Sequence, residues 1–179
     1  MAAKTTWVID PSHSEIAFKV KHLMISNVKG FFSEFSGQLV TDGDDFSTAE
    51  INFQINAASI NTGVADRDGH LKSPDFFDVE NFKEITFLAG KLTKKGEDEF
   101  ALTGNLTIKG VSQPVNLKVE FGGLMADPWG NEKAGFTLSG KLNRKDFGLT
   151  WNAALEAGGV LVGEEVSLSC DIELVKQKS

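Results

Sequence analysis

The chain has 179 residues but only one cysteine, Cys170, and three histidines, His13, His22 and His70. A single cysteine excludes a disulfide-stapled scaffold, and its place in an alternating apolar segment predicts a small core residue. No histidine has a partner four residues away, and no Cys-His cluster suggests zinc. We therefore expect no bound metal and no cofactor.

Positive charge is also scarce. Eighteen Lys and Arg against twenty-five Asp and Glu give a formal net charge of −7. This balance argues against nucleic acid and against anionic membrane surfaces as partners. The basic pairs Lys94-Lys95 and Arg144-Lys145 are short and are interpreted as solvated turns.

Long apolar runs are missing as well. Residues Met1 to Thr6 contain no apolar run, and no later stretch is long enough for a membrane-spanning helix. We therefore expect no stable membrane insertion and a soluble, cytoplasmic protein, or a periplasmic one if a leader has been removed.

Helical periodicity is nearly absent, and apolar and polar residues instead alternate with a period of two. Alternation gives each strand one dry and one wet face, and eight such strands favour a sandwich or a closed barrel. The apolar positions are Ile16-Phe18-Val20, Phe31-Ser33-Phe35-Gly37-Leu39, Ile51-Phe53-Ile55, Ile85-Phe87-Ala89, Phe100-Leu102-Gly104-Leu106-Ile108, Val115-Leu117-Val119-Phe121, Ala134-Phe136-Leu138-Gly140-Leu142 and Val166-Leu168-Cys170-Ile172-Leu174.

Short polar turns between these segments predict antiparallel connections. Examples are residues 41–45, 94–97 and 109–114, which are compact enough for hairpins. Since no linker, repeat or low-complexity tract interrupts the chain, we expect one domain over residues 1–179.

Helix is expected only in an insertion at about residues 61–80. Asn61 or Thr62 is predicted to cap a first short helix. Ser73-Pro74-Asp75 predicts the start of a second helix, with a capping oxygen, a proline at its first position and a carboxylate near the positive dipole end. This second helix would present Phe76 and Phe77, either as a plug at a barrel end or as a seat on the core.

The interior predicted from the alternation is almost wholly apolar, since the chain has fourteen Phe and no Tyr. Large inward residues are interrupted by small ones, which fits either a packed taper or a lumen that holds a long apolar molecule. The side chains predicted to contact such a molecule are Phe18, Phe35, Phe53, Ile55, Phe76, Phe77, Phe87, Leu106, Phe136 and Trp151.

Candidate chemistry is sparse. Asp66-Arg67-Asp68-Gly69-His70 is the densest polar cluster, and it fits a head-group contact, an acid–base group or a set of structural ion pairs. Arg67 and His70 are the candidates for the mouth of the lumen. No nucleophile elbow or nucleophile–base arrangement is visible, and Gly122-Gly123 and Gly158-Gly159 lack the setting of a phosphate loop. We predict no catalytic residue.

Several motifs, in order along the chain, resemble those of the YceI-like family. They are residues 7–14, Val20-Lys21-His22, Ser59-Ile60-Asn61-Thr62, residues 67–73, Asp75-Phe76-Phe77-Asp78, residues 104–111, Asp127-Pro128-Trp129-Gly130, residues 144–148 and residues 158–163. Phe82-Lys83 departs from the aromatic–proline pair expected there. The resemblance implies an all-β fold, an extended eight-stranded antiparallel barrel of lipocalin-like form that holds a polyisoprenoid or similar amphiphile. It also implies a possible homodimer and a role in stress response or isoprenoid-quinone transport.

Three functions are open. The first is a carrier or store for an isoprenoid lipid, with an uncharged head such as a quinone because so acidic a chain offers few cations at the mouth. The second is an enzyme acting on such a lipid, with His70, Arg67 or Asp68 as the acid–base group. The third is a ligand-free barrel that works through surface or dimer contacts.

Overall fold

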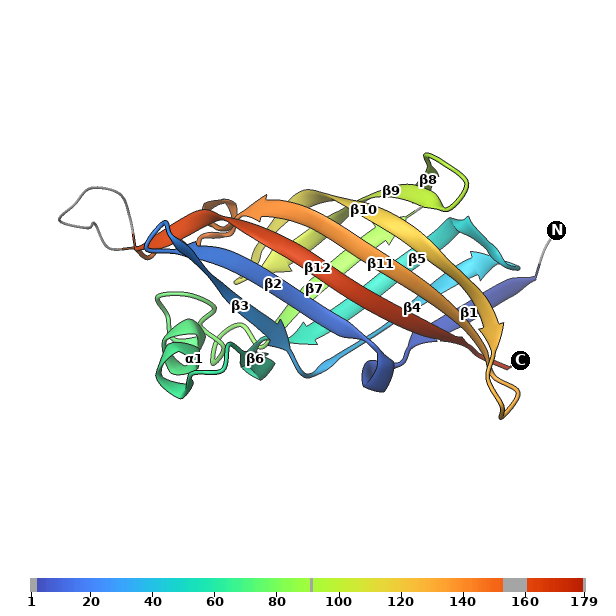
Figure 1. The fold of residues 1–179 in the computed structure, drawn as a ribbon, viewed down its shortest axis with the longest axis horizontal. Helices are drawn as coiled ribbons and strands as arrows, with labels where there is room; N and C mark the ends of the chain where they lie inside the picture. Colours follow the sequence, from blue (N-terminus) through green and yellow to red (C-terminus); the bar gives the residue numbers. More distant parts are fainter. Residues whose placement is uncertain (1–2, 91, 153–160, 179) are drawn as a thin grey trace.

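A computed structural model describes residues 3–90, 92–152 and 161–178 (Figure 1). Within them the chain is mostly strand, with one α-helix, α1 (Ala65–Lys72), and three short 3-10 helices, η1 (Pro11–His13), η2 (Ala57–Ser59) and η3 (Arg144–Phe147). The strands are β1 (Lys4–Ile9), β2 (Glu15–His22), β3 (Ser26–Phe32), β4 (Phe35–Asp42), β5 (Asp45–Asn56), β6 (Ile60–Asn61), β7 (Glu84–Gly90), β8 (Leu92–Lys94), β9 (Glu99–Ile108), β10 (Val111–Ala126), β11 (Glu132–Asn143) and β12 (Val162–Lys176).

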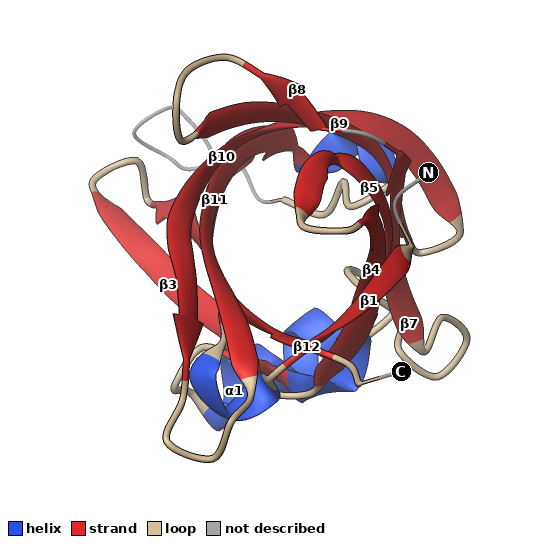
Figure 2. Ribbon diagram, turned by 90° about the vertical axis from the view of Figure 1, so that its right-hand side faces the viewer, coloured by secondary structure: helices blue, strands red, loops and turns tan. Residues whose placement is uncertain are grey.

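Eight strands close a ring in the order β1-β4-β5-β7-β9-β10-β11-β12, with β12 returning to β1. Trp7 is the closing residue, paired with Leu39 of β4 on one side and Lys176 of β12 on the other. Every neighbouring pair is antiparallel, and Figure 2 looks along the resulting ring. The extended eight-stranded barrel is confirmed, and the sandwich is excluded.

The predicted strand from Phe31 to Leu39 is wrong, because it is two strands. β3 pairs with β2 while β4 pairs with β1, and the chain bends between them at Ser33 and Glu34. At the bend the Ser33 N–H donates to the Ser59 carbonyl and the Asn56 N–H donates to the Glu34 carbonyl. These bonds to the η2 region replace the ladder, so β2 and β3 form a hairpin that extends the barrel wall beyond the closed ring.

The two ends of the barrel differ. At the end near the termini, the Phe46 ring packs against Trp7 in a tilted arrangement and meets Phe136 edge-on, with ring centroids 5.0 Å apart in each pair. The buried Trp7 indole donates to the Thr41 hydroxyl at 3.0 Å. A second cluster, which includes Phe32 and Phe147, lies toward α1 at the other end. Aromatic packing thus closes the end near the termini, while the insertion covers the other end.

In the insertion the first predicted helix is confirmed as α1, but its predicted N-cap and the predicted second helix are wrong. The N-cap of α1 is Val64, which makes no side-chain bond, rather than Asn61 or Thr62. The Thr62 hydroxyl and N–H instead donate to the Asp68 carboxylate. The predicted second helix at Ser73 is a series of turns, since Ser73 ends α1 and its hydroxyl donates to the His70 carbonyl at 2.6 Å. Asp78 then takes a φ of 47°, which turns the chain back toward β7.

Candidate functional site

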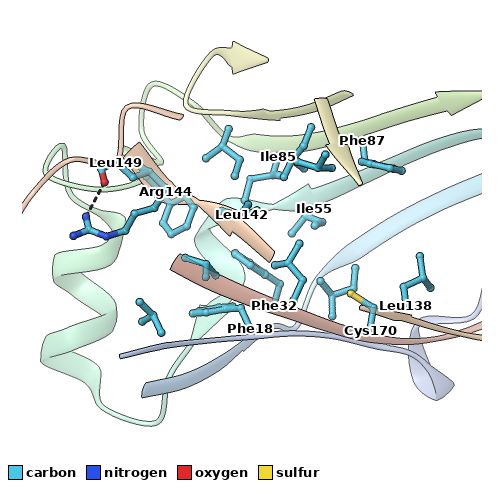
Figure 3. A pocket seen from close by; sticks show the side chains of 18 of the residues that line it. Phe18, Phe32, Ile55, Ile85, Phe87, Leu138, Leu142, Arg144, Leu149 and Cys170 are labelled. Atoms are coloured by element: carbon cyan, nitrogen blue, oxygen red, sulfur yellow. Dashed lines mark hydrogen bonds between the residues drawn. The ribbon is translucent and has the colours of Figure 1, made fainter. Parts of the chain in front are cut away.

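An apolar cavity of about 500 Å³ runs along the inside of the barrel. Its wall is made by inward positions of β2, β3, β4, β5, β7, β9, β10, β11 and β12, together with the insertion and the segment after η3. Figure 3 shows side chains from facing strands, such as Ile55, Phe87 and Leu138, pointing into this space. The volume lies within the range of small-molecule sites, about 300–1,000 Å³.

Nine of the ten side chains predicted to contact a ligand lie on this wall: Phe18, Phe53, Ile55, Phe76, Phe77, Phe87, Leu106, Phe136 and Trp151. Phe35 is not among the lining residues, and its ring packs against the cluster of Trp7 and its neighbours. That these nine side chains touch a lipid stays a prediction.

Small residues let large rings lie flat against the wall. An added Cβ at Gly104 would come within 2.4 Å of the Phe87 ring, and one at Gly30 within 2.5 Å of the Phe18 ring. Aromatic rings of neighbouring strands therefore occupy the space beside Gly30 and Gly104, while the Leu117 side chain occupies the space beside Gly140. The free volume is left along the axis rather than at the glycines.

The mouth of the cavity is framed by an aromatic group on the insertion and on the segment after η3. His70 lies 4.6 Å from Trp151 and 5.1 Å from Phe76, and Phe76 lies 5.5 Å from Trp151, all between ring centroids. Phe77 meets Phe32 edge-on at 6.1 Å. Phe76 is buried although it sits on a short turn, so the insertion is fixed to the barrel through this contact.

Arg144 is the site residue that sequence reasoning missed, because the pair Arg144-Lys145 has the composition of a solvated turn. Its guanidinium is buried, with 3% of the residue exposed, and donates to four backbone carbonyls. The acceptors are Gly163, Leu149, Trp151 and Val162, at 2.8, 2.7, 2.8 and 3.2 Å (Figure 3 shows the Leu149 bond). The signal available in the sequence was the family-like motif at residues 144–148.

Burial lowers the pKa of the Arg144 guanidinium, while Glu164 opposes the shift. Arginine nevertheless stays a cation in proteins. No described carboxylate makes a salt bridge with Arg144, so its direct polar contacts are the four carbonyls, and the centroid of the Phe76 ring lies 6.0 Å from the guanidinium carbon. Lys145, in contrast, is half exposed and pairs with Glu164 at 2.7 Å.

Basic side chains outnumber acidic ones at the mouth. Lys21, His22, Arg67, His70 and Arg144 line the cavity, and Asp66 is the one carboxylate in the described lining. The expectation of few cations there is wrong, because net charge does not report how charge is distributed.

Two of the candidate polar residues, Arg67 and Asp68, form hydrogen bonds with Thr62. Arg67 donates to the Thr62 hydroxyl and carbonyl, each at 2.7 Å. Asp68 accepts both Thr62 bonds and is not part of the cavity wall. Thr62 therefore ties this charged cluster to β6.

His70 has a carboxylate partner, since its Nε2 lies 2.9 Å from Asp75 Oδ2. The nearby Ser73 hydroxyl is directed to the His70 carbonyl rather than to the ring. The pair orients the imidazole at the mouth, and the arrangement lacks a nucleophile bonded to it among the described residues.

A second polar cluster lies outside the barrel. Ligand atoms of Asp10, His13 and Glu173 lie within 4.8 Å of one another. The Lys133 ammonium lies between the two carboxylates, 3.2 Å from Asp10 and 2.9 Å from Glu173. This ammonium supplies the positive charge that a metal would bring, so the cluster works as an ion-pair network that ties η1 to β11 and β12.

The similarity of this chain to known proteins extends over nearly its whole length. The family description that matches is the YceI-like domain, over residues 7–174. The chain belongs to the YceI-like family. A UPF0312 protein of Staphylococcus aureus (strain MSSA476) is 39% identical over 170 residues, which cover 94% of this chain and 96% of that protein. Gly158, Gly159 and Val160 of the last family motif lie outside the described residues.

Several solved structures share the barrel fold. The YceI protein of Campylobacter jejuni is 34% identical, with a TM-score of 0.74 over 88% of this chain and 90% of that one. Burkholderia cenocepacia BcnA is 21% identical, with a TM-score of 0.80 over 92% and 98% of the two chains. A polyisoprenoid-binding domain from Saccharophagus degradans is 14% identical, with a TM-score of 0.71 over 96% and 98%. Among the described residues, no helix is both long and apolar enough to cross a membrane.

Proposed function

We propose that this YceI-like protein binds one long-chain isoprenoid lipid, a polyisoprenoid or an isoprenoid quinone, in the barrel lumen and acts as its carrier or store. The observation that carries the proposal is the elongated apolar cavity of about 500 Å³, closed by aromatic packing near Trp7 and Phe46 and lined by polar groups only at its α1 end. Such a space suits a chain with an apolar tail and a polar head.

Tail burial supplies the affinity. Each methylene removed from water contributes about 0.8 kcal/mol, so a few isoprene units supply on the order of 10 kcal/mol before ordering costs. The tail needs no polar anchor, which agrees with the apolar wall formed by residues such as Phe53, Phe87 and Phe136.

The head group is proposed to be a hydrogen-bond acceptor. Arg144 and Arg67 face the mouth without a salt bridge to a described carboxylate, and Asp75 orients His70 beside them. Carbonyl oxygens of a quinone and oxygens of a phosphate both offer acceptors to these groups. The neutral head expected from net charge alone therefore has no advantage at this mouth.

A binding role without catalysis is favoured over an enzyme. Apart from Lys21 and His22 at the end of β2, the strand residues that line the cavity are apolar. Asp68 is held by Thr62 away from the cavity, and the Ser73 hydroxyl is directed to the His70 carbonyl rather than to its ring. Relatives by fold include a binding domain, although at 14% identity that likeness concerns the fold alone. The ligand-free barrel is disfavoured by the open lumen.

The test is organic extraction of the purified full chain followed by mass spectrometry of the extract. The expected result is a co-purifying isoprenoid near one molecule per chain, with the mass separating a quinone from a phosphate head. An extract without lipid, together with no uptake of added isoprenoid quinone or prenyl phosphate, would contradict the proposal.

A matched pair of variants places the ligand in the lumen. Phe53→Glu puts a charge on the cavity wall and should abolish lipid binding, because an unpaired buried charge is costly. Leu88→Glu places the same charge on the outer face of β7, where Leu88 is 51% exposed, and should bind normally. If Phe53→Glu does not fold, Cys170→Phe tests the same point by filling the lumen with an apolar ring.

A further inference from the structure

The turn between β2 and β3 presents three bulky apolar side chains to solvent. Leu23, Met24 and Ile25 are 39%, 61% and 83% exposed. They form the protruding tip of a hairpin rather than one wall of a groove. A continuous apolar tip of this kind is uncommon on a protein surface unless it contacts another apolar phase.

The backbone of this turn is strained as well. Leu23 and Met24 have φ values of 53° and 62°, and the Ile25 N–H donates to the His22 carbonyl at 3.2 Å. Tight turns with two positive φ angles are normally built from Asn, Asp or Gly. Large apolar side chains are held here in a conformation that disfavours them, a pattern that accumulates at functional positions.

Around the tip, the hairpin is basic. Lys19, Lys21 and Lys29 are exposed, and the sequence from Ile16 to Ser33 contains no Asp or Glu. Lys19 and Lys29 are direct cross-strand partners, an arrangement in which like charges repel. None of the three has an ion-pair partner within the described parts of the chain, whereas Lys133 and Lys176 each have two.

The tip stands beside the cavity mouth. The Leu23 N–H donates to the Leu161 carbonyl at 2.9 Å, and His22 pairs with Val162 of β12. Val20, His22 and Leu161 line the cavity itself. In Figure 1 this turn and α1 lie at the same end of the molecule, opposite the termini.

We propose that the β2–β3 hairpin docks the barrel on the surface of an anionic lipid bilayer, with the tip of Leu23, Met24 and Ile25 among the lipid chains. The three lysines contact anionic head groups, and the mouth faces the bilayer from which the lipid enters. This inference rests on the proposed lipid-binding function. The net charge of −7 does not oppose this contact locally, because residues 16–33 carry three lysines and no Asp or Glu.

A bilayer fits these features better than a protein partner does. A protruding apolar tip needs a soft phase that it can enter, and unpaired lysines need a surface that offers several anions. Each lysine close to an anionic membrane strengthens binding by about fivefold, so the three together contribute roughly a hundredfold at low salt.

The experiment is co-sedimentation of the full chain with vesicles of phosphatidylcholine alone or mixed with phosphatidylglycerol. The parent protein should bind the mixed vesicles, and added salt should weaken that binding. Met24→Ser with Ile25→Ser should lower the affinity at least tenfold, and Lys19→Gln with Lys21→Gln and Lys29→Gln should remove the preference for phosphatidylglycerol.

The control is Leu124→Ser with Met125→Ser, which changes apolar residues of β10 that are 46% and 77% exposed. They pair with Ala134 and Lys133 of β11, which pair with Leu174 and Val175 near the C-terminus. This variant should bind like the parent. The inference would be overturned if the parent protein did not bind the mixed vesicles, or if the tip and control variants lost equal vesicle affinity. It would also be overturned if the parent were a dimer that only the tip substitutions dissociate. Lipid extracted from the tip variant in normal amount separates failed docking from failed lipid binding.

Discussion

The ring of Phe53 on β5 lies over Gly37 on β4. The two residues are cross-strand partners, and a Cβ added at Gly37 would fall 1.7 Å from Phe53 Cδ1. The Phe53 ring can lie along the wall because Gly37 has no side chain. The shape of the cavity therefore depends on glycine at position 37.

Gly37→Ala should force the Phe53 ring away from β4. Because overpacking shifts side chains from their preferred rotamers, we expect a loss of about 1–3 kcal/mol in unfolding free energy and less bound lipid. Gly135→Ala is the control, since nothing lies within 4 Å of a Cβ at that position. Chemical denaturation and lipid extraction measure both effects, and equal behaviour of the two variants would show that Phe53 has room to move.

Phe76→Ala with Phe77→Ala should open the mouth. Phe76 packs between His70 and Trp151, and Phe77 contacts Phe32, so their loss removes the cover from the α1 end. We expect faster release of lipid to acceptor vesicles, beyond the change in stability. Val64→Ala, on the exposed part of the insertion, should leave release unchanged. Equal release rates in the parent, the double variant and Val64→Ala would show that both phenylalanines only pack against the fold and do not retain the lipid.

Arg144→Met should destabilise the fold by at least about 3 kcal/mol, because several backbone carbonyls would lose a charged donor in a buried place. Lys145→Met is the neighbouring control. It removes an exposed ion pair with Glu164, which is worth under about 1 kcal/mol. Thermal unfolding compares the two variants, and similar losses would show that Arg144 has no special role.

Stability should fall in acid through Asp10. Hydrogen bonds from Ser12 and then His13 hold the pKa of the Asp10 carboxyl well below its usual range. In the unfolded chain this carboxyl titrates near its ordinary value of about 3.9. Its contribution is therefore present above that pH and is lost as pH falls toward the folded-state pKa.

Asp10→Asn should destabilise the protein at pH 7, and the difference from the parent should shrink as pH is lowered below about 4. Asp45→Asn is the control at pH 7. Its carboxylate also binds a serine, Ser47, but has no described cationic partner. Denaturant titrations at several pH values measure the difference, and a constant gap would contradict the assignment.

Cys170 offers a probe of occupancy. Burial raises the pKa of its thiol to about 11, so only about a thousandth of it is thiolate at pH 8. Its modification by a thiol reagent should be slow in the native protein and slower still with lipid in the lumen, where Cys170 lines the wall. Equal rates with and without lipid would place the ligand elsewhere.

Part of the site is predictable from local patterns. A period of two assigns the inward face of each strand, which is why alternation by itself places Phe18, Phe53, Phe87 and Phe136 on the inner wall. The alternation fails at Phe31, because hydrogen bonds to η2 break the ladder at Ser33 and Glu34. As a result Phe32 lines the cavity while Phe31 is 38% exposed. Those bonds join residues more than twenty positions apart and leave no trace in the local sequence.

The charged groups also divide into those that local sequence predicts and those that only the tertiary structure places. Arg144 next to Lys145 has the composition of an exposed turn, and its burial follows from four carbonyls that segments 149–151 and 162–163 bring around it. Similarly, the sequence alone established an all-β chain whose strands have an apolar inner face, because the side-chain alternation of a strand is a local property. β1, which closes the ring, was not among the strands predicted from alternation. Whether the inner face encloses a packed core or an open lumen was decided by the tertiary structure. Ring closure through Trp7 and the stacking of rings such as Phe53 on wall glycines depend on distances that alternation does not encode.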